Sequence, residues 1–538
     1  MAKLSKLLLS IFFIALANLL YAQQIKLSKG VTKALSTVDT AQFKADIKYL
    51  ADDKLLGRMP GTPGYQMAVD YVVGRLKGLG VKPAGDNNGW VQQVKLRKAF
   101  VHDAIVSIDN APAPAGGYTI YPNPATPNVK ISAGLVFAGY GISEPALGYD
   151  DYAGLDAKGK IVLIIRGTPD KFSSSVAAHV SNSTEILKVA AEHGAVGVII
   201  CSTDSTAPLL NLSRGIYSVL DQQGKVAVSR IYYSDQVSVF GNFSYKLFNT
   251  LLNDSGKSIK DIVTQLKSGQ PISFPINASV NVSYASTYQD IISYNVIGKI
   301  TGSDPKLKKT YIVHSAHLDH LGIGPPVKGD SIYNGAHDNA SGVASVLAIA
   351  KIYQNIKIKP KRSILCVLLT GEEMGDLGSG YFAKHPTVPN KSIVADVNTD
   401  MPAIIAPLLS ITALGAEHSS LAKQVDQAAG YLDLGVEPDP EPKQARFTRS
   451  DQYSFVLQGI PALHIKYGSK TADGKNNMND IAAAWRAKYY HKPQDDINGI
   501  FDFAAGKKYA QLNFLIGYLV AQDVQKPTWN AGDIFAGK

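Results

Sequence analysis

The chain has 538 residues, of which 45% are hydrophobic and 18% charged, and its formal net charge is +10. This length exceeds that of one compact core, and the apolar content excludes a broadly disordered chain. Lysines and arginines are scattered among acidic residues, and no nucleic-acid-binding motif is present. The positive charge therefore does not indicate a nucleic-acid partner.

The first 22 residues have the layout of a secretory signal peptide. Two lysines precede the apolar run Leu7–Leu20, and the small Ala22 stands before a polar pair. The run is shorter than the roughly 20 apolar residues of a comfortable membrane span, and no later segment is long and apolar enough to cross a bilayer. We expect export to the periplasm or the extracellular space with no stable membrane span after cleavage; an uncleaved anchor is the alternative.

The two cysteines, Cys201 and Cys366, lie in separate apolar runs that read as strands of different domains. We expect two buried free thiols rather than a disulfide. Core packing, and a metal if one binds, must then stabilise the fold.

Residues 38–84 read as two helices with apolar stripes, separated by a Gly/Pro-rich loop at 56–64. Residues 109–128 contain five prolines and two adjacent glycines, a composition that favours extended or turn structure. This segment is the first candidate domain boundary.

From about 130 to 285 the pattern changes to short apolar strands separated by turns. Strands are expected at 134–138, 160–165 and 197–200, and an amphipathic helix at 184–194. No residues here combine a nucleophile with a base or with metal-ligand spacing, so we expect a β-rich accessory domain.

From about 293 onward apolar strands alternate with helices, which is typical of an α/β fold with a mainly parallel sheet. Strands are expected at 310–314, 363–369, 393–399 and 461–466, and a helix at about 340–354. In such sheets ligands bind beyond the carboxyl ends of the strands. Chemistry is therefore expected at those ends.

Metal-type ligands cluster at the expected strand ends and in two nearby loops. They are His317, Asp319, Asp338, Glu372, Glu373, Asp400 and His491. Burying so many charges without compensation would be costly, so a divalent metal cluster is the economical explanation. Imidazole and carboxylate without thiolate favour Zn²⁺, and less exclusively Co²⁺ or Mn²⁺. One shared carboxylate could hold two ions about 3.5–4 Å apart, as in two-metal hydrolases.

The order and spacing of these motifs resemble the M28 family of zinc-dependent exopeptidases, in particular its aminopeptidases. The matching pieces are His317-x-Asp319, GAHDNASG at 335–342, Glu372-Glu373, Asp400 and YHKPQD at 490–495, with GRMPGT at 57–62 similar to the family's N-terminal loop. Pieces of 139–195 resemble the protease-associated (PA) domain that is inserted in several exopeptidases.

The resemblance implies a role for each residue. Asp338 would bridge two zinc ions, one completed by His317 and Asp400, the other by Glu373 and His491. Glu372 would be the general base and Asp319 would orient His317; a cis peptide is implied between Asp338 and Asn339. Tyr490, beside a ligand, is placed to donate to the oxyanion or simply to pack. His314 and His320 are rival ligands that we interpret as hydrogen-bonded groups beside the site.

The expected fold is α/β of the zinc-exopeptidase, phosphorylase/hydrolase-like type, with a mainly parallel mixed sheet flanked by helices and an inserted β-rich PA domain. The expected division is a signal peptide at 1–22, the N-terminal part of the peptidase domain with a linker at 23–128, the PA domain at 129–287 and the zinc peptidase domain at 288–538. The PA domain is expected to contribute no metal ligand and to act as a lid or a recognition surface.

The leading functional hypothesis is a secreted aminopeptidase with two Zn²⁺ ions that acts on peptide or protein N-termini. A carboxypeptidase of the same family is one alternative, because Arg446 and Arg449 could hold a substrate carboxylate. A glutaminyl-cyclase-like acyltransferase, which needs one metal, is another. The third is an inactive receptor-like binding protein, against which the intact ligand set argues.

Overall fold

The computed structural model describes residues 27–537. The expected signal peptide at 1–22 lies outside these residues. Among the described helices, none is both long enough and apolar enough to cross a membrane.

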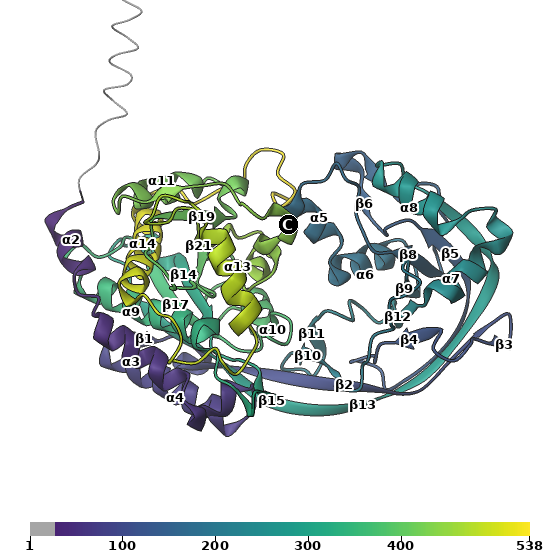
Figure 1. The fold of residues 1–538 in the computed structure, drawn as a ribbon, viewed down its shortest axis with the longest axis horizontal. Helices are drawn as coiled ribbons and strands as arrows, with labels where there is room; N and C mark the ends of the chain where they lie inside the picture. Colours follow the sequence, from purple (N-terminus) through teal and green to yellow (C-terminus); the bar gives the residue numbers. More distant parts are fainter. Residues whose placement is uncertain (1–26, 538) are drawn as a thin grey trace, which may run out of the picture.

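Two lobes lie side by side, and a long two-stranded ribbon joins them along one edge (Figure 1). The ribbon consists of β2 (Val91–Ile108) and β13 (Ser273–Ile300), which pair antiparallel from Val91 with Val296 to Ile108 with Val280. One end of the ribbon belongs to the sheet of the first lobe and the other end to the sheet of the second. The two lobes therefore share strands.

The first lobe is a mixed sheet whose central strands are parallel. Its order is β13, β17 (Ser363–Leu369), β14 (Tyr311–His317), β18 (Ile393–Asn398), β21 (Ala462–Tyr467), β19 (Ser410–Leu414) and β20 (Gly435–Val436). Strands β17, β14, β18 and β21 run parallel, whereas β13 runs antiparallel to β17 and β19 runs antiparallel to β21. The short β1 (Lys82–Pro83) pairs with the end of β13.

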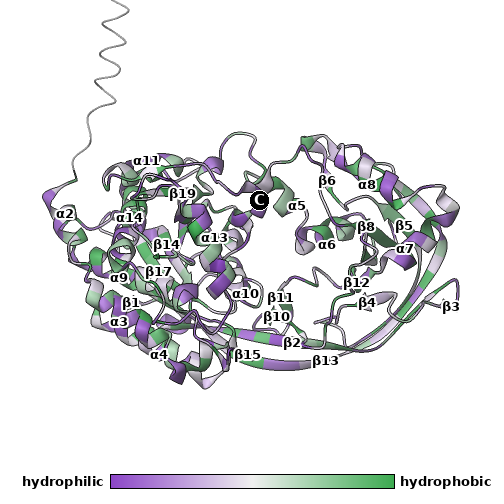
Figure 2. Ribbon diagram, viewed as in Figure 1, coloured by the Kyte–Doolittle hydropathy of each residue, from purple (hydrophilic) through white to green (hydrophobic). Residues whose placement is uncertain are grey.

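Helices cover both faces of this sheet. One face carries α2 (Lys29–Leu35), α3 (Thr40–Leu50), α4 (Pro63–Gly78), α9 (Ser341–Asn355) and α14 (Phe503–Gln522), around a core that includes Leu347 and Phe514. The other carries α10 (Leu377–Lys384) and α12 (Gln452–Val456), around a core with Phe382 and Phe455. Also in this lobe are α11 (Ala422–Gly430) and α13 (Met478–Tyr489). Figure 2 shows the apolar central strands enclosed by these helices.

The second lobe contains a smaller sheet with its own two cores. Its order is β13, β5 (Asn128–Ala138), β8 (Ile161–Ile165), β9 (Gly197–Cys201), β12 (Val239–Phe243) and β4 (Tyr118–Ile120). Helices α5 (Ser174–Val180), α6 (Ser183–Glu192), α7 (Tyr245–Leu252) and α8 (Ile259–Lys267) pack around it. The hairpin β10 (Ile216–Leu220) and β11 (Val226–Ser229) leaves this sheet and pairs with β2 instead.

The α/β class, the mainly parallel strands and the β-rich inserted lobe are confirmed. The predicted strands and helices are present, most of them within three residues at each end, but β5 begins at Asn128 rather than at 134. Cys201 and Cys366 are free and buried, as expected.

Candidate metal centre

The predicted ligands meet at one edge of the first lobe. His317 is the last residue of β14, Glu372 and Glu373 follow β17, and Asp400 follows β18. Because these three strands are parallel neighbours, their carboxyl ends lie at the same edge. Asp338 lies in the turn of 336–340 that leads into α9.

The ligand atoms are spaced around the two oxygens of Asp338. Nε2 of His317 lies 3.3 Å from Oδ1 of Asp338 and 3.3 Å from Oδ1 of Asp400. Nε2 of His491 lies 3.2 Å from Oδ2 of Asp338 and 3.3 Å from Oε2 of Glu373. Each oxygen of Asp338 therefore faces a different histidine.

These distances fit a zinc pair. With Zn–N and Zn–O bonds of about 2.0–2.1 Å at tetrahedral angles, two ligands of one ion stand about 3.3–3.4 Å apart. All four measured distances agree with this spacing within about 0.2 Å. They are too long for strong hydrogen bonds, so the side chains are arranged as if around ions rather than against one another.

His320 competes with His491 for the second position. His320, Asp338 and Glu373 offer atoms that lie within 4.8 Å of one another, as do His317, Asp338 and Asp400. However, Nδ1 of His320 is only 2.7 Å from Oε1 of Glu373, shorter than the spacing of two ligands on one zinc. Neither atom makes a well-oriented hydrogen bond within the described residues, although both are buried. The distance from His491 to Oε2 of Glu373 therefore agrees better with two ligands of one ion, whereas His320 lies against Oε1 of Glu373.

The cluster is buried and its charges are strongly coupled. Burial alone would lower the pKa of His317, but Glu372, Asp338 and Asp400 raise that pKa well above its usual value. Burial would raise the pKa of Asp338, yet the two facing histidines hold it well below the usual range. Burial raises the pKa of Glu372 well above its usual value, with Asp376 and Asp400 adding to the effect against the opposing influence of His317.

Asp319 lies under the cluster and is fully buried. Its carboxylate accepts the backbone N–H of Glu372 at 3.2 Å and that of Glu373 at 3.4 Å. Nδ1 of His317 lies 3.2 Å from the backbone oxygen of Asp319 but 3.9 Å from its carboxylate. The geometry thus links Asp319 to His317 through the main chain, while its carboxylate orients the two glutamates.

Two buried side chains that the sequence analysis gave no role organise the loops. Asp495 accepts the backbone N–H of His337 and that of Asp338, both at 3.0 Å, and so holds the turn that carries Asp338. The peptide bond between Asp338 and Asn339 is cis, as expected. Arg58 donates to the carbonyl oxygens of Leu318 and Gly335, and to two further carbonyls of neighbouring segments. The signal for them in the sequence is that Arg58 lies in the motif at 57–62 and Asp495 in the motif at 490–495.

The other residues singled out from the sequence lie around the cluster. His337 points away from it, stacks on Phe501 and lies 3.0 Å from the Ile500 carbonyl. His314 is buried deeper in the sheet, beside Tyr353. The ring of Tyr490 stacks on His491.

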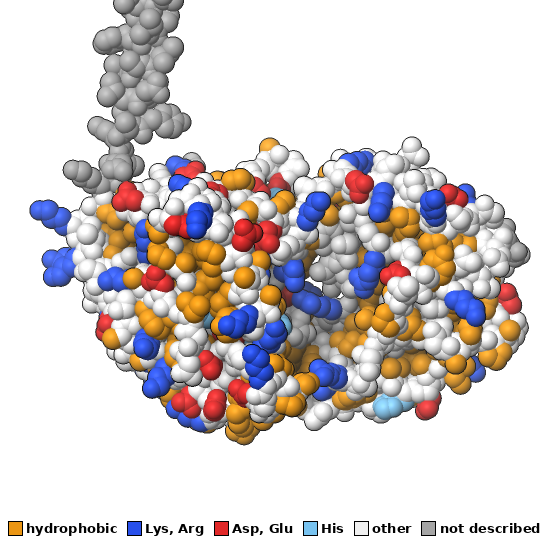
Figure 3. Space-filling view, in the orientation of Figure 1, with side chains coloured by type: hydrophobic (Ala, Val, Ile, Leu, Met, Phe, Trp, Pro, Cys, Tyr) orange, Lys and Arg blue, Asp and Glu red, His pale blue; other side chains and the backbone are white. Residues whose placement is uncertain are grey.

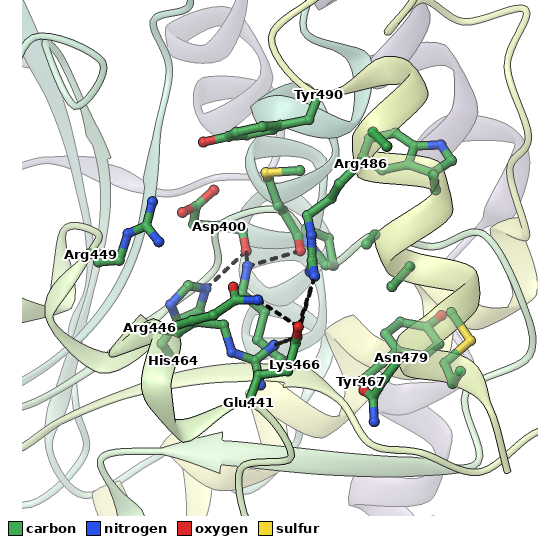
Figure 4. A pocket seen from close by; sticks show the side chains of 18 residues that line it. Asp400, Glu441, Arg446, Arg449, His464, Lys466, Tyr467, Asn479, Arg486 and Tyr490 are labelled. Carbon is green, nitrogen blue, oxygen red and sulfur yellow. Dashed lines mark hydrogen bonds and ion pairs between the residues drawn. The ribbon is translucent and has the colours of Figure 1, made fainter. Parts of the chain in front are cut away.

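A cavity of about 430 Å³ adjoins Asp400 and Tyr490 (Figure 4). Met401, Met478 and Trp485 contribute apolar walls. At its floor the side chain of Lys466 donates to the carbonyl oxygens of Asp400 and Met401.

Charged residues of the same cavity form a network. Arg446 pairs with Asp439 and Glu441, and Arg486 also pairs with Glu441. By contrast, the guanidinium of Arg449 has no ion pair or hydrogen bond to any residue within 27–537. Of the two arginines considered for substrate binding, only Arg449 is therefore available.

Comparison with known families decides the assignment. The family model described as peptidase family M28 matches residues 295–512, and the PA domain model matches residues 126–234. Residues 295–512 are therefore similar to peptidase family M28. The second lobe contains a PA domain inserted before the M28 segment. The match to the M28 model supports a metallo-exopeptidase as the class of enzyme.

Several peptidases are similar to the chain. A probable leucine aminopeptidase 2 of Aspergillus oryzae is 25% identical over 53% of this chain and 56% of its own length. Carboxypeptidase Q of Rattus norvegicus is 33% identical over 38% of this chain and 43% of its length. The chain thus spans about half the length of these two relatives. A probable lipoprotein aminopeptidase, LpqL, of Mycobacterium tuberculosis is 25% identical over 87% of this chain and 82% of its length.

A search of solved structures finds an aminopeptidase from Aneurinibacillus sp. strain AM-1. It is 19% identical, with 92% of this chain and 99% of that chain covered, and its TM-score is 0.47.

Proposed function

We propose that this chain is an exported exopeptidase of the M28 type that holds two zinc ions and removes N-terminal residues from peptides. The observation that carries the proposal is the arrangement of His317 and His491 on opposite oxygens of Asp338, with Asp400 and Glu373 completing two sets of three ligands. The shared carboxylate is what two ions about 3.5–4 Å apart require. A single-metal acyltransferase would not need both sets.

The two ions, when bound, would polarise the scissile carbonyl and lower the pKa of an attacking water. Glu372 is the general base: it takes a proton from that water and passes it to the leaving amine. Its burial favours the protonated form and so suits it to carry a proton between these two steps. Asp319 accepts the backbone N–H groups of Glu372 and Glu373 and so fixes their loop. In this position Glu372 can act as the base while Glu373 binds metal.

The cavity beside Asp400 and Tyr490 receives the N-terminal residue of the substrate. It opens from the cluster and is walled by side chains of the first lobe alone. The hydroxyl of Tyr490 donates no hydrogen bond to a described residue, so it is available to donate to the oxygen of the scissile carbonyl. Apolar walls with a cationic floor would accept side chains of more than one kind.

A carboxypeptidase of the same family is the second candidate, and Arg449 is the observation that favours it. Its exposed guanidinium borders both the cavity beside Asp400 and the one beside Glu372. Arg446 does not favour it, since Asp439 and Glu441 already neutralise that side chain.

Export rests on the signal-like segment at 1–22 and on the similarity to a protein named as a lipoprotein aminopeptidase. Mass spectrometry of the protein purified from its native compartment tests this proposal. Cleavage after Ala22 would give a chain that begins at Gln23.

The activity is tested with a panel of aminoacyl substrates that carry either a free or an acetylated N-terminus. An aminopeptidase hydrolyses the free amines only, loses this activity on treatment with a chelator and regains it with Zn²⁺. Hydrolysis of the N-acetylated peptides from their C-terminus would instead establish the carboxypeptidase alternative.

A further inference from the structure

The two lobes enclose a second cavity of about 530 Å³ next to the metal centre. The first lobe contributes Glu372, Glu373 and Arg449 to its wall, and the PA lobe contributes Arg166 and Arg230. Figure 3 shows a hollow between the lobes with basic side chains gathered along it. The general base therefore faces the PA lobe across this space.

Positive charge in this cavity is in excess. Arg230 forms an ion pair with Asp376, which neutralises one of the three arginines. Arg166 and Arg449 are exposed, and within residues 27–537 neither guanidinium has an ion pair or a hydrogen bond. In the proposed function the two carboxylates in the wall already have roles, because Glu372 transfers the proton and Glu373 binds a metal ion. A carboxylate from elsewhere would satisfy the remaining charge.

Contacts between the lobes keep the arginines close to the metal centre. Besides the pair of Arg230 with Asp376, Nζ of Lys384 donates to the carbonyl oxygen of Ala227 at 2.9 Å. On the other side of the hollow, Nδ1 of His179 lies 2.6 Å from the hydroxyl oxygen of Tyr453. The ribbon of β2 and β13 adds a covalent connection along the edge. The PA lobe is thus tied to the first lobe on both sides of the cavity.

The direction of the reaction decides which part of the substrate enters here. Glu372 must deliver its proton to the leaving amine, so the leaving residues lie on the side of Glu372. Glu372 lines the inter-lobe cavity, whereas Asp400 lines the cavity beside Tyr490 that receives the N-terminal residue. The N-terminal residue and the leaving residues therefore occupy different cavities. Arg166 and Arg230 then lie on the side of the leaving residues, and Arg449 lies where the two cavities meet.

We propose that the PA lobe forms part of the substrate site, with Arg166 of that lobe and Arg449 of the first lobe binding a carboxylate on the leaving side of the scissile bond. This inference rests on the proposed function. The carboxylate is the C-terminus of a dipeptide or tripeptide, or an acidic side chain that follows the cleaved bond. In the first case the enzyme processes short peptides, and in the second it prefers acidic residues after the N-terminal one.

Two pairs of substrates distinguish these sources. The first pair is leucyl-glycine and its C-terminal amide; the second is leucyl-glutamic acid α-amide and leucyl-glutamine amide. We expect kcat/KM to be at least about tenfold higher for the acid in one of the pairs, because a charge-assisted contact is lost in its neutral counterpart. Equal values within both pairs would overturn the proposal while leaving the exopeptidase assignment intact.

Variants attribute the preference to the PA lobe. Arg166→Ala should lower the acid-to-amide ratio about tenfold, and Arg166→Lys should restore part of it, because the charge returns without the bidentate fork. Arg214→Ala removes an exposed arginine of the PA lobe outside the cavity and should leave the ratio unchanged. Because a ratio is compared within each variant, a general loss of activity cancels. An unchanged ratio in Arg166→Ala and in Arg449→Ala contradicts the proposal.

Binding provides a readout that does not depend on turnover. Calorimetry with the reduced-amide analogues of the same two acid–amide pairs should show about tenfold tighter binding of an acid form, and a loss of this difference in Arg166→Ala. If the protein cleaved no peptide yet showed this preference, the proposed function would fail and the carboxylate site would stand. Equal binding within both pairs would refute the site.

Discussion

Glu372 and Glu373 are neighbours in the chain but have different surroundings. Both line the inter-lobe cavity, but Glu373 lies 3.3 Å from His491 and contacts His320, whereas Glu372 forms no ion pair with a histidine among the described residues. We predict that Glu372→Gln keeps both zinc ions, because no ligand is removed, and lowers kcat about 10²–10⁴-fold, because the proton acceptor is lost. Metal analysis beside steady-state kinetics measures both. An unchanged rate would mean that the base lies elsewhere.

Glu373→Gln and His491→Ala should have the opposite effect on metal content. Each removes a donor from the second ion and leaves Asp338 with an uncompensated oxygen, so zinc should fall towards one ion per chain. His320→Ala is the comparison variant: it contacts Glu373 without the spacing of a shared ion and should retain two zincs. If His320→Ala lost one zinc ion and His491→Ala retained two, His320 rather than His491 would be the ligand of the second ion.

Asp151 of the PA lobe gives a test of pH dependence away from the metal. Its buried carboxylate accepts the backbone N–H groups of Tyr140 and Ile142 and the hydroxyl of Tyr149. Burial raises its pKa to about 7, against the opposing effect of these hydrogen bonds. The unfolded value is about 3.9, so between about pH 4 and 7 the folded state keeps a proton that the unfolded state releases.

The stability that Asp151 contributes is therefore greatest at low pH and is lost as the pH rises through about 7. We predict that Asp151→Asn gains stability relative to the wild type between pH 5 and 8, since the amide does not titrate. Denaturant unfolding at the two pH values measures the difference. The exposed Asp103→Asn is the control and should show no such trend. A constant difference between Asp151→Asn and the wild type would contradict the raised pKa.

At the scale of elements, the loop of 53–58 anchors the metal centre to the helices at the N-terminus. Arg58 is 1% exposed and donates hydrogen bonds to carbonyl oxygens of Leu50, Leu318, Asn334 and Gly335. These carbonyls belong to the end of α3 and to two loops beside the cluster. One side chain thus fixes three segments that are far apart in the sequence.

We predict that Arg58→Ala lowers the free energy of unfolding by at least about 3 kcal/mol, because several buried carbonyls lose their donor. It should also weaken zinc binding, since the loops after His317 and before Asp338 lose their support. Lys54→Ala, an exposed change in the same 3₁₀ segment, should cost less than about 1 kcal/mol. Denaturant unfolding and zinc titration measure the two effects. Equal stability of the two variants would refute this role of Arg58.

Strands and helices with strong local patterns could be predicted from the sequence, and the ribbon could not. The apolar runs at 363–369 and 393–399 carry their own signal because both faces of these strands are buried. β2 and β13 are 18 and 28 residues long and alternate between exposed and buried positions without a continuous apolar run. Paired residues of the two strands are 172 to 205 positions apart in the sequence, and local periodicity does not reveal such pairing.

The candidate site was predictable for a different reason. Proposed ligands such as His317, at the end of β14, and Glu373, after β17, lie at the carboxyl ends of parallel strands, so their residue type and their place in the chain suffice to predict that they meet. Asp495 and Arg58 support the cluster through hydrogen bonds to backbone groups. No rule of sequence spacing predicts such contacts. The arginines of the PA lobe lie near the candidate metal centre because the two lobes are joined. No sequence motif predicts this proximity.

On the scale of the whole molecule, the metal centre joins segments from the entire first lobe. Its proposed ligands lie at the end of β14, after β17 and β18, before α9 and after α13. Without ions, the carboxylates and histidines remain buried with incomplete compensation. We predict that removal of zinc by a chelator lowers Tm and that stoichiometric Zn²⁺ restores it, because the ions bind only the folded state. Differential scanning calorimetry measures the shift; an unchanged Tm would indicate a cluster that needs no metal.

The central claim is that two zinc ions flank Asp338. Anomalous diffraction at the zinc absorption edge, from crystals of the purified protein, tests it most directly. We expect two peaks about 3.5–4 Å apart, one beside His317 and Asp400 and the other beside Glu373 and His491. A single peak, or peaks away from Asp338 in a protein that still hydrolyses peptides, would contradict the account.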